Sequence, residues 1–454
     1  MRKITILLFM IAVLCPSLKV LAEGEGYIVK FKNEYIPTEV KSNLIESGLG
    51  NNVYLTDDVD NLYKYNSIIE YIETNETVHL IDEEINNIQC FSDDAVNTTA
   101  WQLDMVKAQY VWDLGNHGNN INIGVIDSGC NQHIDIVNNL AGGHNYILNT
   151  DDYSDNIGHG THVTGIIAAE DNDFGITGIA PKANIYALKC FDKNYDTTVS
   201  MLAKAIYSAV DDYHCRVINM SLGLGKDIQT LHDAIEYAFA KGVIIVAAVG
   251  NDGNSTLYYP AAYDEVIGVG SIGANKEKSY FSQFNESVFV VSPGESYYSL
   301  KGTDEYVNAQ GTSQATPLVS GAAAILLSAK PSISNTKFKE ALENNSTDLG
   351  EPGYDTKYGY GLLDMEALFR SAIDRYYVSQ ITKGKIVVYN NTDTDLYATG
   401  VWTKETDNGN VCVKLDKVSI SAQGNMPLEC ETEKVKFFLW DSLNTMRPLT
   451  IARN

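Results

Sequence analysis

Short and almost continuously apolar segments recur through the middle of this chain, separated by stretches with helical spacing. The apolar segments are Ile121–Ile126, Ile185–Lys189, Val217–Met220, Val243–Val249 and Val266–Val269. Strands of this kind are typical of parallel sheets that are covered on both faces. Helices are expected at Thr198–Tyr213, at Leu231–Ala240 and at Thr312–Ala329, of which the last is apolar almost all round and should be buried. The pattern predicts an α/β domain built on a parallel sheet.

The regions on either side of this domain have different patterns and different charge. Residues 23–92 carry 4 basic and 14 acidic side chains, and an alternating strand is expected at Tyr27–Lys32. Residues 371–454 carry 10 of each charge. Strands separated by turn residues are expected there at Lys385–Tyr389, Asp395–Thr403, Val411–Val418 and Lys434–Trp440. The expected domains are therefore 23–95, 96–370 and a β-sandwich-like region at 371–454.

The N-terminus has the pattern of an export signal. Arg2 and Lys3 precede the apolar run Ile4–Leu14, and Ala22 offers a small residue for cleavage. Eleven apolar residues are too few to cross about 30 Å of hydrocarbon as a helix. Lipid attachment at Cys15 is the alternative, although a large residue precedes it. The sequence predicts a signal peptide at 1–22, a secreted product and no transmembrane segment.

Charge and cysteine content exclude several classes of protein. The 454 residues carry a formal net charge of −25, which argues against nucleic-acid binding, because a nucleic-acid binder would need a basic face to displace phosphate counterions. The cysteines beyond the signal are widely spaced and form no C-x-x-C pair, so neither a zinc site nor a dense disulfide framework is indicated. Cys412 and Cys430 are expected either to pair or to be buried free thiols.

Four polar residues stand where strands end or helices begin. Asp127 and Asn251 directly follow apolar strands, and His159 and Ser313 lead into apolar helices. Taken singly, Asp127 could cap a turn and Ser313 could cap a helix. A metal site using His159 and His162 would lack its third ligand. Taken together, an aspartate, a histidine and a serine at the ligand-binding edge of a parallel sheet favour nucleophilic catalysis.

Five motifs, in this order along residues 100–370, carry a resemblance to the subtilisin-like serine proteases. They are Ile126-Asp127-Ser128-Gly129, Gly158–His162, Asn219–Gly223, Val249–Asn251 and Gly311–Pro317. The resemblance implies a seven-stranded parallel α/β domain that cuts peptide bonds through an acyl-enzyme.

The resemblance also assigns the catalytic roles. Ser313 would be the nucleophile, and His159 would be its general base and then its general acid. Asp127 would orient the imidazole. Asn251 would bind the oxyanion together with the Ser313 backbone N–H.

Substrate contacts are implied at two places. Ser221, Leu222 and Gly223 would pair with an extended polypeptide as an added strand. Asp252 would line the primary specificity pocket and favour a basic residue, with a solvated loop residue as the alternative. Tyr258 stands where related proteases often have glycine, and a tyrosine there would narrow the pocket, so the two residues make conflicting predictions.

Relatives of this kind often bind calcium, for which Asp135 and Asn172 are the candidate oxygen ligands. An acidic surface loop is the alternative reading of the same residues. No organic cofactor is expected.

The first region resembles a propeptide that assists folding and then inhibits the enzyme, with the self-cleavage junction within Ser92–Thr99. The sequence thus predicts a secreted serine endopeptidase that is made as a self-processing zymogen. Its partners would be a polypeptide substrate and its own propeptide. The alternatives are a processing protease dedicated to one peptide and a catalytically silent relative that binds or signals.

Overall fold

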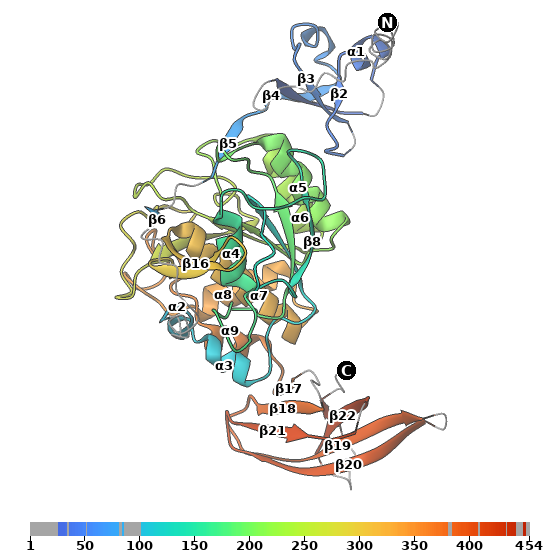
Figure 1. Cartoon of the computed structure of the whole chain (residues 1–454), viewed down its shortest axis with the longest axis vertical. Coiled ribbons are helices and arrows are strands. Elements are labelled where there is room, and N and C mark those ends of the chain that lie inside the picture. The colour runs from blue at the N-terminus through green and yellow to red at the C-terminus, as the bar shows by residue number, and fades with distance from the viewer. Residues whose placement is uncertain are drawn as a thin grey trace, which may run out of the picture. The chain divides into compact units, whose positions relative to one another are not determined.

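The computed structural model describes residues 26–33, 36–50, 52–80, 84–85, 101–379, 384–406, 409–432, 434–441 and 448–450. The chain divides into two compact units, Met1–Thr77 and Val78–Asn454 (Figure 1). The predicted signal peptide, the junction at Ser92–Thr99 and Cys90 lie outside the described residues.

The first unit is a small antiparallel sheet with one short helix. Its strands, in the spatial order β2-β3-β1-β4, are β2 (Ile45–Glu46), β3 (Val53–Thr56), β1 (Tyr27–Phe31) and β4 (Ile69–Thr74). The helical segments are α1 (Thr38–Lys41) and the 3-10 turn η1 (Tyr63–Tyr65). Val29 and Phe31 of β1 are buried in its core. The strand predicted at Tyr27–Lys32 is therefore confirmed.

The second unit is built on a seven-stranded sheet in which every pairing is parallel. The spatial order is β14 (Val290–Pro293), β13 (Val266–Ile272), β12 (Ile244–Ala248), β11 (Val217–Met220), β7 (Asn122–Asp127), β9 (Asn184–Lys189) and β8 (Leu140–Asn145). The five predicted strands are all present. The two that the pattern missed, β8 and β14, are the edge strands.

Two pairs of long helices cover the faces of this sheet (Figure 1). α4 (His159–Ala168) packs on α7 (Thr312–Ala329), and α5 (Val199–Asp211) packs on α6 (Gln229–Ala240). Every residue of α7 is buried, as its apolar sequence predicts. The shorter elements are α2 (Trp101–Met105), α3 (Ala108–Asp113), α8 (Asn335–Asn345), α9 (Met365–Ala372), β5 (Thr77–His79), β6 (Glu84–Ile85), β10 (Asp196–Thr198), β15 (Tyr297–Lys301) and β16 (Glu305–Gln310).

The strand order reverses its direction of growth beside β7. From β7 the chain first builds β8 and β9 on one side, and it then crosses to β11 on the other side. Ligands of parallel sheets bind where the order reverses, outside the carboxyl ends of the strands. Asp127, the last residue of β7, lies at this point.

The C-terminal region folds as two antiparallel sheets around one core. One sheet contains β17 (Tyr376–Val378), β18 (Lys385–Asn390) and β21 (Asn425–Glu429). The other contains β20 (Gly409–Ile420), β19 (Leu396–Thr406), β22 (Val435–Trp440) and β23 (Pro448–Thr450). Trp402 and Phe437 are fully buried between them. The predicted β-rich region is confirmed, whereas pairing of Cys412 with Cys430 is not, since both thiols are free and Cys412 is exposed.

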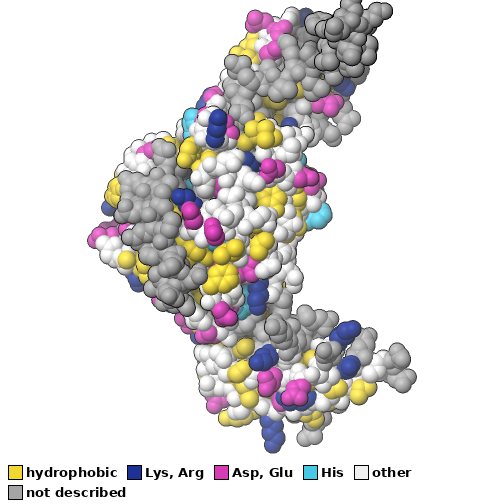
Figure 2. All heavy atoms as spheres, viewed as in Figure 1, with side chains coloured by type: hydrophobic (Ala, Val, Ile, Leu, Met, Phe, Trp, Pro, Cys, Tyr) yellow, Lys and Arg dark blue, Asp and Glu magenta, His cyan; other side chains and the backbone are white. Residues whose placement is uncertain are grey.

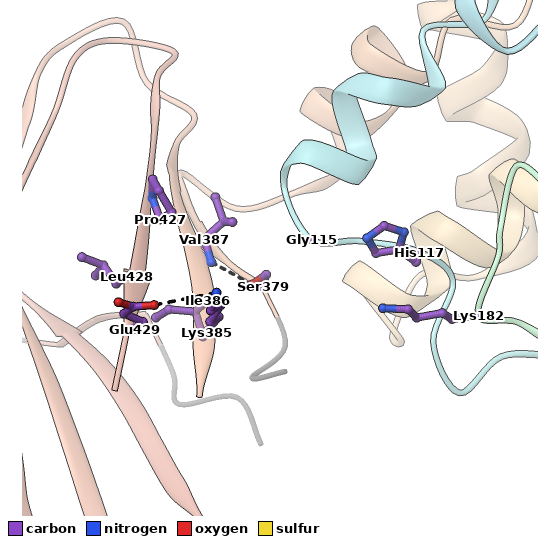
Figure 3. Close-up of a pocket in the computed structure, with 10 residues that line it drawn as sticks. All are labelled: Gly115, His117, Lys182, Ser379, Lys385, Ile386, Val387, Pro427, Leu428 and Glu429. Carbon is purple, nitrogen blue, oxygen red and sulfur yellow. Dashed lines mark hydrogen bonds and ion pairs between the residues drawn. The ribbon is translucent and has the colours of Figure 1, made fainter. Parts of the chain in front are cut away.

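A cavity of about 630 Å³ lies where this β-rich region meets the α/β domain (Figure 3). Gly115, His117 and Lys182 line it on one side, and residues of β18 and β21 line it on the other. Lys385 and Glu429 within it form an ion pair.

Charged side chains of the described residues are scattered over the face of the molecule that Figure 2 shows. On the face drawn in Figure 2, acidic side chains are spread over the molecule, and basic ones recur on the C-terminal region. None of the helices that the structure describes is long and apolar enough to span a bilayer.

Candidate active site

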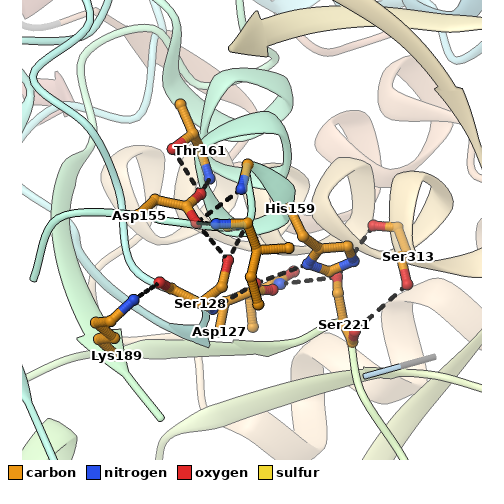
Figure 4. Close-up of polar contacts among 12 residues, drawn as sticks. Asp127, Ser128, Asp155, His159, Thr161, Lys189, Ser221 and Ser313 are labelled. Carbon is orange, nitrogen blue, oxygen red and sulfur yellow. Dashed lines mark hydrogen bonds and ion pairs between the residues drawn. The ribbon is translucent and has the colours of Figure 1, made fainter. Parts of the chain in front are cut away.

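Four side chains converge at the carboxyl edge of the sheet. Asp127 ends β7, His159 begins α4, Asn251 follows β12, and Ser313 is the second residue of α7. Residues that are far apart in the sequence therefore lie close together in space, because the strands and helices that carry them end or begin at the same edge of the sheet. In Figure 4 the imidazole of His159 lies between Asp127 and Ser313.

Asp127 and His159 form a tight buried pair. The Nδ1 atom of His159 lies 2.6 Å from Oδ1 of Asp127, and the two side chains are 3% and 0% exposed. Burial raises the pKa of the Asp127 carboxyl, while His159 and the Ser128 backbone N–H, 2.7 Å from Oδ1, act in the opposite direction. Because the carboxylate accepts the Nδ1 proton, Nε2 is left as the basic nitrogen of the ring.

This pair requires a close approach between α4 and the turn after β7. A Cβ atom on Gly160 would lie 2.2 Å from the Gly129 carbonyl oxygen and 3.0 Å from the Asp127 carboxylate. Only glycine fits there, so Gly160 lets the helix bring His159 to Asp127.

Ser313 contacts the segment that follows β11. Its hydroxyl donates to the Ser221 carbonyl oxygen at 3.3 Å, and the Ser221 hydroxyl donates to the Ser313 carbonyl oxygen at 3.0 Å. Ser313 stands in the first turn of α7, where backbone N–H groups have no partner within the helix and the helix dipole is positive. Negative charge that develops beside Ser313 is therefore stabilised.

Asn251 is oriented by Thr312. The Oδ1 atom of Asn251 accepts both the backbone N–H and the hydroxyl of Thr312, each at 2.8 Å. The Nδ2 atom is consequently turned to Gly311, where it would lie 2.9 Å from an added Cβ. An amide donor thus faces the loop that carries Ser313.

Comparison with known proteins agrees with this geometry. The model of the Subtilase family matches residues 118–361, which is more than half of the chain. The chain belongs to the subtilase family.

Individual subtilases match at 32–38% identity. Minor extracellular protease Epr of Bacillus subtilis is 37% identical over 301 residues, which cover 66% of this chain and 46% of that protein. Subtilisin DY of Bacillus licheniformis is 38% identical over 275 residues, 60% of this chain and 98% of its own length. Thermostable alkaline protease of Halalkalibacterium halodurans is 35% identical over 266 residues, 59% of this chain and 72% of its own. The chain therefore spans about half the length of Epr but nearly all of Subtilisin DY.

Asp155, a residue that sequence reasoning missed, supports the start of α4 in this subtilase (Figure 4). Its Oδ1 atom accepts the backbone N–H groups of residues 157 and 158 at 2.9 and 2.8 Å. Its Oδ2 atom accepts the backbone N–H and the hydroxyl of Thr161 at 2.9 and 2.7 Å. The carboxylate therefore caps the start of α4 from outside the helix.

Ser128 links Asp155 to the turn after β7. Its hydroxyl donates to Asp155 Oδ1 at 2.9 Å and accepts the Gly160 backbone N–H at the same distance. The strand that carries Asp127 and the helix that carries His159 are thus held by one hydroxyl.

A buried lysine contacts the network that Asp155 and Ser128 form. Lys189, the last residue of β9, is 3% exposed, and its Nζ atom donates to the Ser128 carbonyl oxygen at 2.5 Å. Burial lowers the pKa of the Lys189 ammonium, and Asp155 and Asp127 act in the opposite direction. In sequence Lys189 had only the pattern of a strand terminus, so no local signal could have revealed it.

The two expected calcium ligands, Asp135 and Asn172, do lie together, but Asn172 contacts Asp135 with its amide N–H and not with an oxygen atom. Asn172 Nδ2 donates to Oδ1 of Asp135 at 2.9 Å, while the Ile176 N–H and the Tyr306 hydroxyl donate to its Oδ2 at 2.9 and 3.2 Å. Burial raises the pKa of the Asp135 carboxyl to about 6. Three hydrogen atoms that point at one carboxylate do not form a cation site, so this arrangement does not fit calcium. The prediction of calcium at Asp135 and Asn172 therefore rests on the family resemblance alone and gains no support from these contacts.

His162 takes no part in a metal site with His159. Its Nε2 atom contacts the carbonyl oxygens of Tyr297 and Val307 at 3.1 and 3.2 Å, and the residue is 1% exposed. His162 is therefore a packed histidine that holds α4 against β15 and β16.

Proposed function

We propose that this subtilase is a secreted serine endopeptidase made as a zymogen. One observation carries the proposal: the buried Asp127–His159 hydrogen bond of 2.6 Å beside Ser313 at the start of α7. That arrangement supports a serine whose proton can pass to an oriented imidazole.

In the acylation step, Oγ of Ser313 attacks the carbonyl carbon of a peptide bond and its proton moves to Nε2 of His159. Asp127 stabilises the imidazolium that forms. The negative oxygen of the tetrahedral intermediate accepts hydrogen bonds from Asn251 Nδ2 and from the Ser313 backbone N–H. The proton then passes to the leaving amine, and the acyl group stays on Ser313.

Deacylation repeats these steps with water as the nucleophile. His159 takes a proton from the water, and Ser313 leaves as its hydroxyl when the acid product is released. The segment of Ser221, Leu222 and Gly223 beside Ser313 would hold the substrate chain as an added strand.

Two segments near the N-terminal border of the second unit support self-inhibition. Val78 and Leu80 are buried, and the Leu80 N–H donates to the Tyr195 carbonyl oxygen at 2.9 Å, next to β10. Strand β6 pairs with β16, which leads directly into Gly311 and the nucleophile. The chain thus contacts the segment before β10 ahead of residues 81–83, and it pairs with the strand that leads to Ser313 after them.

Intact masses of purified residues 23–454 test the proposal, as wild type and as Ser313→Ala. We expect only the wild type to lose about 70 residues, with the new N-terminus within the predicted junction Ser92–Thr99. A fluorophosphonate that reacts with activated serines should label the wild type and spare Ser313→Ala. A wild type that is neither cleaved nor labelled would contradict the proposal and favour a silent binding protein.

A processing protease dedicated to one peptide would pass the same test. It would differ by cleaving very few members of a diverse peptide library. The large acidic excess of the chain could steer basic peptides, but it also serves solubility.

A further inference from the structure

The proposed reaction determines where the residue before the scissile bond must lie. In the acyl-enzyme its carbonyl carbon is bonded to Ser313 Oγ, and its oxygen faces Asn251. Its side chain therefore lies within a few ångströms of both residues. Two glycines lie close to this position along the chain. Gly250 precedes Asn251, and Gly223 is two residues from Ser221, which hydrogen-bonds Ser313.

The ring of Tyr258 fills this space. A Cβ atom placed on Gly250 would lie 2.9 Å from Tyr258 Cδ2, and one placed on Gly223 would lie 3.4 Å from the same atom. A Cβ atom on Gly225 would lie 3.4 Å from Tyr258 Cε1. The ring thus packs directly on the backbone of both flanking segments, and the three glycines leave room for it.

Hydrogen bonds hold the ring in place at both ends. The Tyr258 hydroxyl donates to Asp252 Oδ2 at 2.8 Å. The fully buried Gln283 fixes that aspartate, because its Nε2 donates to the same oxygen at 3.2 Å and its Oε1 accepts the Asp252 N–H at 2.8 Å. On the other side of the ring, Tyr259 exchanges two backbone hydrogen bonds of 2.8 and 2.9 Å with Leu224.

We propose that Tyr258 closes the primary specificity pocket, so that the enzyme cuts after small residues such as glycine, alanine and serine. A larger side chain would have to displace the ring and break a hydrogen bond to a carboxylate, which is among the stronger kinds. Asp252 then serves to anchor Tyr258 and does not recruit basic residues. This proposal rests on the proposed function and resolves the conflict between the two residues in the sequence.

The small-residue rule also selects among self-cleavage positions. Residues 81–83 are Ile81, Asp82 and Glu83, none of which is small. The predicted junction contains Ser92 and Ala95, so the rule places the mature N-terminus at residue 93 or 96.

The test measures kcat/KM of the mature enzyme on peptides that differ only in the residue before the scissile bond. We expect alanine, glycine and serine to exceed leucine, phenylalanine, lysine and arginine by about tenfold or more. Tyr258→Gly should raise kcat/KM for the large residues, relative to that for alanine, by about tenfold or more. With the ring gone, Asp252 becomes reachable, so Tyr258→Gly should gain most for arginine and lysine, and a further Asp252→Asn should remove that gain.

Tyr258→Phe is the matched control, because it keeps the ring that fills the pocket and removes only the hydroxyl that anchors it to Asp252, so it should keep a weakened small-residue preference. A wild type that prefers large or basic residues would overturn the proposal, as would a profile that Tyr258→Gly leaves unchanged. Fluorophosphonate labelling separates the two levels, since it depends on Ser313 and not on the peptide. A labelled enzyme with a large-residue preference refutes this inference alone, whereas an unlabelled enzyme refutes the proposed function.

Discussion

At the scale of single residues, the buried Lys189 ammonium adds a positive charge close to the buried Asp127–His159 pair. It donates to the carbonyl oxygen of Ser128, the residue that follows Asp127. Replacing it in Lys189→Met removes a positive charge from a poorly solvated site, so protonated forms of the Asp127–His159 pair become easier to form. The acid limb of the kcat/KM profile should therefore move to higher pH, by about half a unit to one unit.

The control is Lys189→Arg, which keeps the charge and should keep the limb within a few tenths of a unit of wild type. Measuring kcat/KM between pH 4 and 9 on one peptide distinguishes the two variants. An acid limb that stays in place in Lys189→Met, while the enzyme remains folded, would mean that the ammonium only fills space.

At the scale of elements, the start of α4 depends on Asp155. Four backbone or hydroxyl donors of residues 157–161 and the Ser128 hydroxyl converge on its two oxygens. Asp155→Asn replaces one acceptor by an N–H group that faces donors, which leaves buried groups unpaired. We expect a loss of about 2 kcal/mol or more in the free energy of unfolding, and a lower kcat with little change in KM.

Calorimetry in a Ser313→Ala background measures the stability without self-digestion. The exposed Asp152 offers a matched control, since within the described part of the chain its carboxylate accepts hydrogen bonds only from Ser154. Asp152→Asn should stay within about 0.5 kcal/mol of its parent. Equal effects of the two substitutions would show that Asp155 does not support the helix.

Elements also differ in how well the sequence predicts them. β7 and β12 were predicted because strands covered on both faces must be apolar. β8 was missed because this edge strand contains Gly142 and Gly143 and has no apolar run. The four residues of the candidate site stood out by their place after strands or before helices and by the family motifs. Asp155 did not, because it lies four residues before the first residue of α4, outside the usual N-cap position, and its contact with Ser128 spans 27 residues.

At the scale of the whole molecule, Arg370 of α9 joins the β-rich C-terminal region to the α/β domain. Its guanidinium lies 4.9 Å from the ring centre of Tyr110 in α3 and 5.4 Å from that of Tyr389 in β18. The same group hydrogen-bonds the Tyr389 hydroxyl and Gln423. The backbone carbonyl oxygen of Arg370 accepts a hydrogen bond from Asn391 Nδ2 at 2.9 Å. Side-chain and backbone contacts of one residue therefore cross this interface.

Arg370→Ala should loosen the β-rich region without changing catalysis. Cation–π contacts of this kind contribute about 0.5–2 kcal/mol, and the hydrogen bonds add to that, so amide exchange in β18 and near residue 423 should become several-fold faster. Exchange in the buried α7 and kcat/KM should stay as in wild type, because Ser313 and its neighbours keep all their contacts.

Arg375→Ala is the control, since that side chain is exposed and the backbone hydrogen bond from the Asn391 N–H to the residue 375 carbonyl oxygen is retained. If both variants exchange at the wild-type rate, the interface is held by contacts other than Arg370. If α7 also loses protection, the two regions fold as one cooperative unit, and the β-rich region then contributes to the stability of the α/β domain itself.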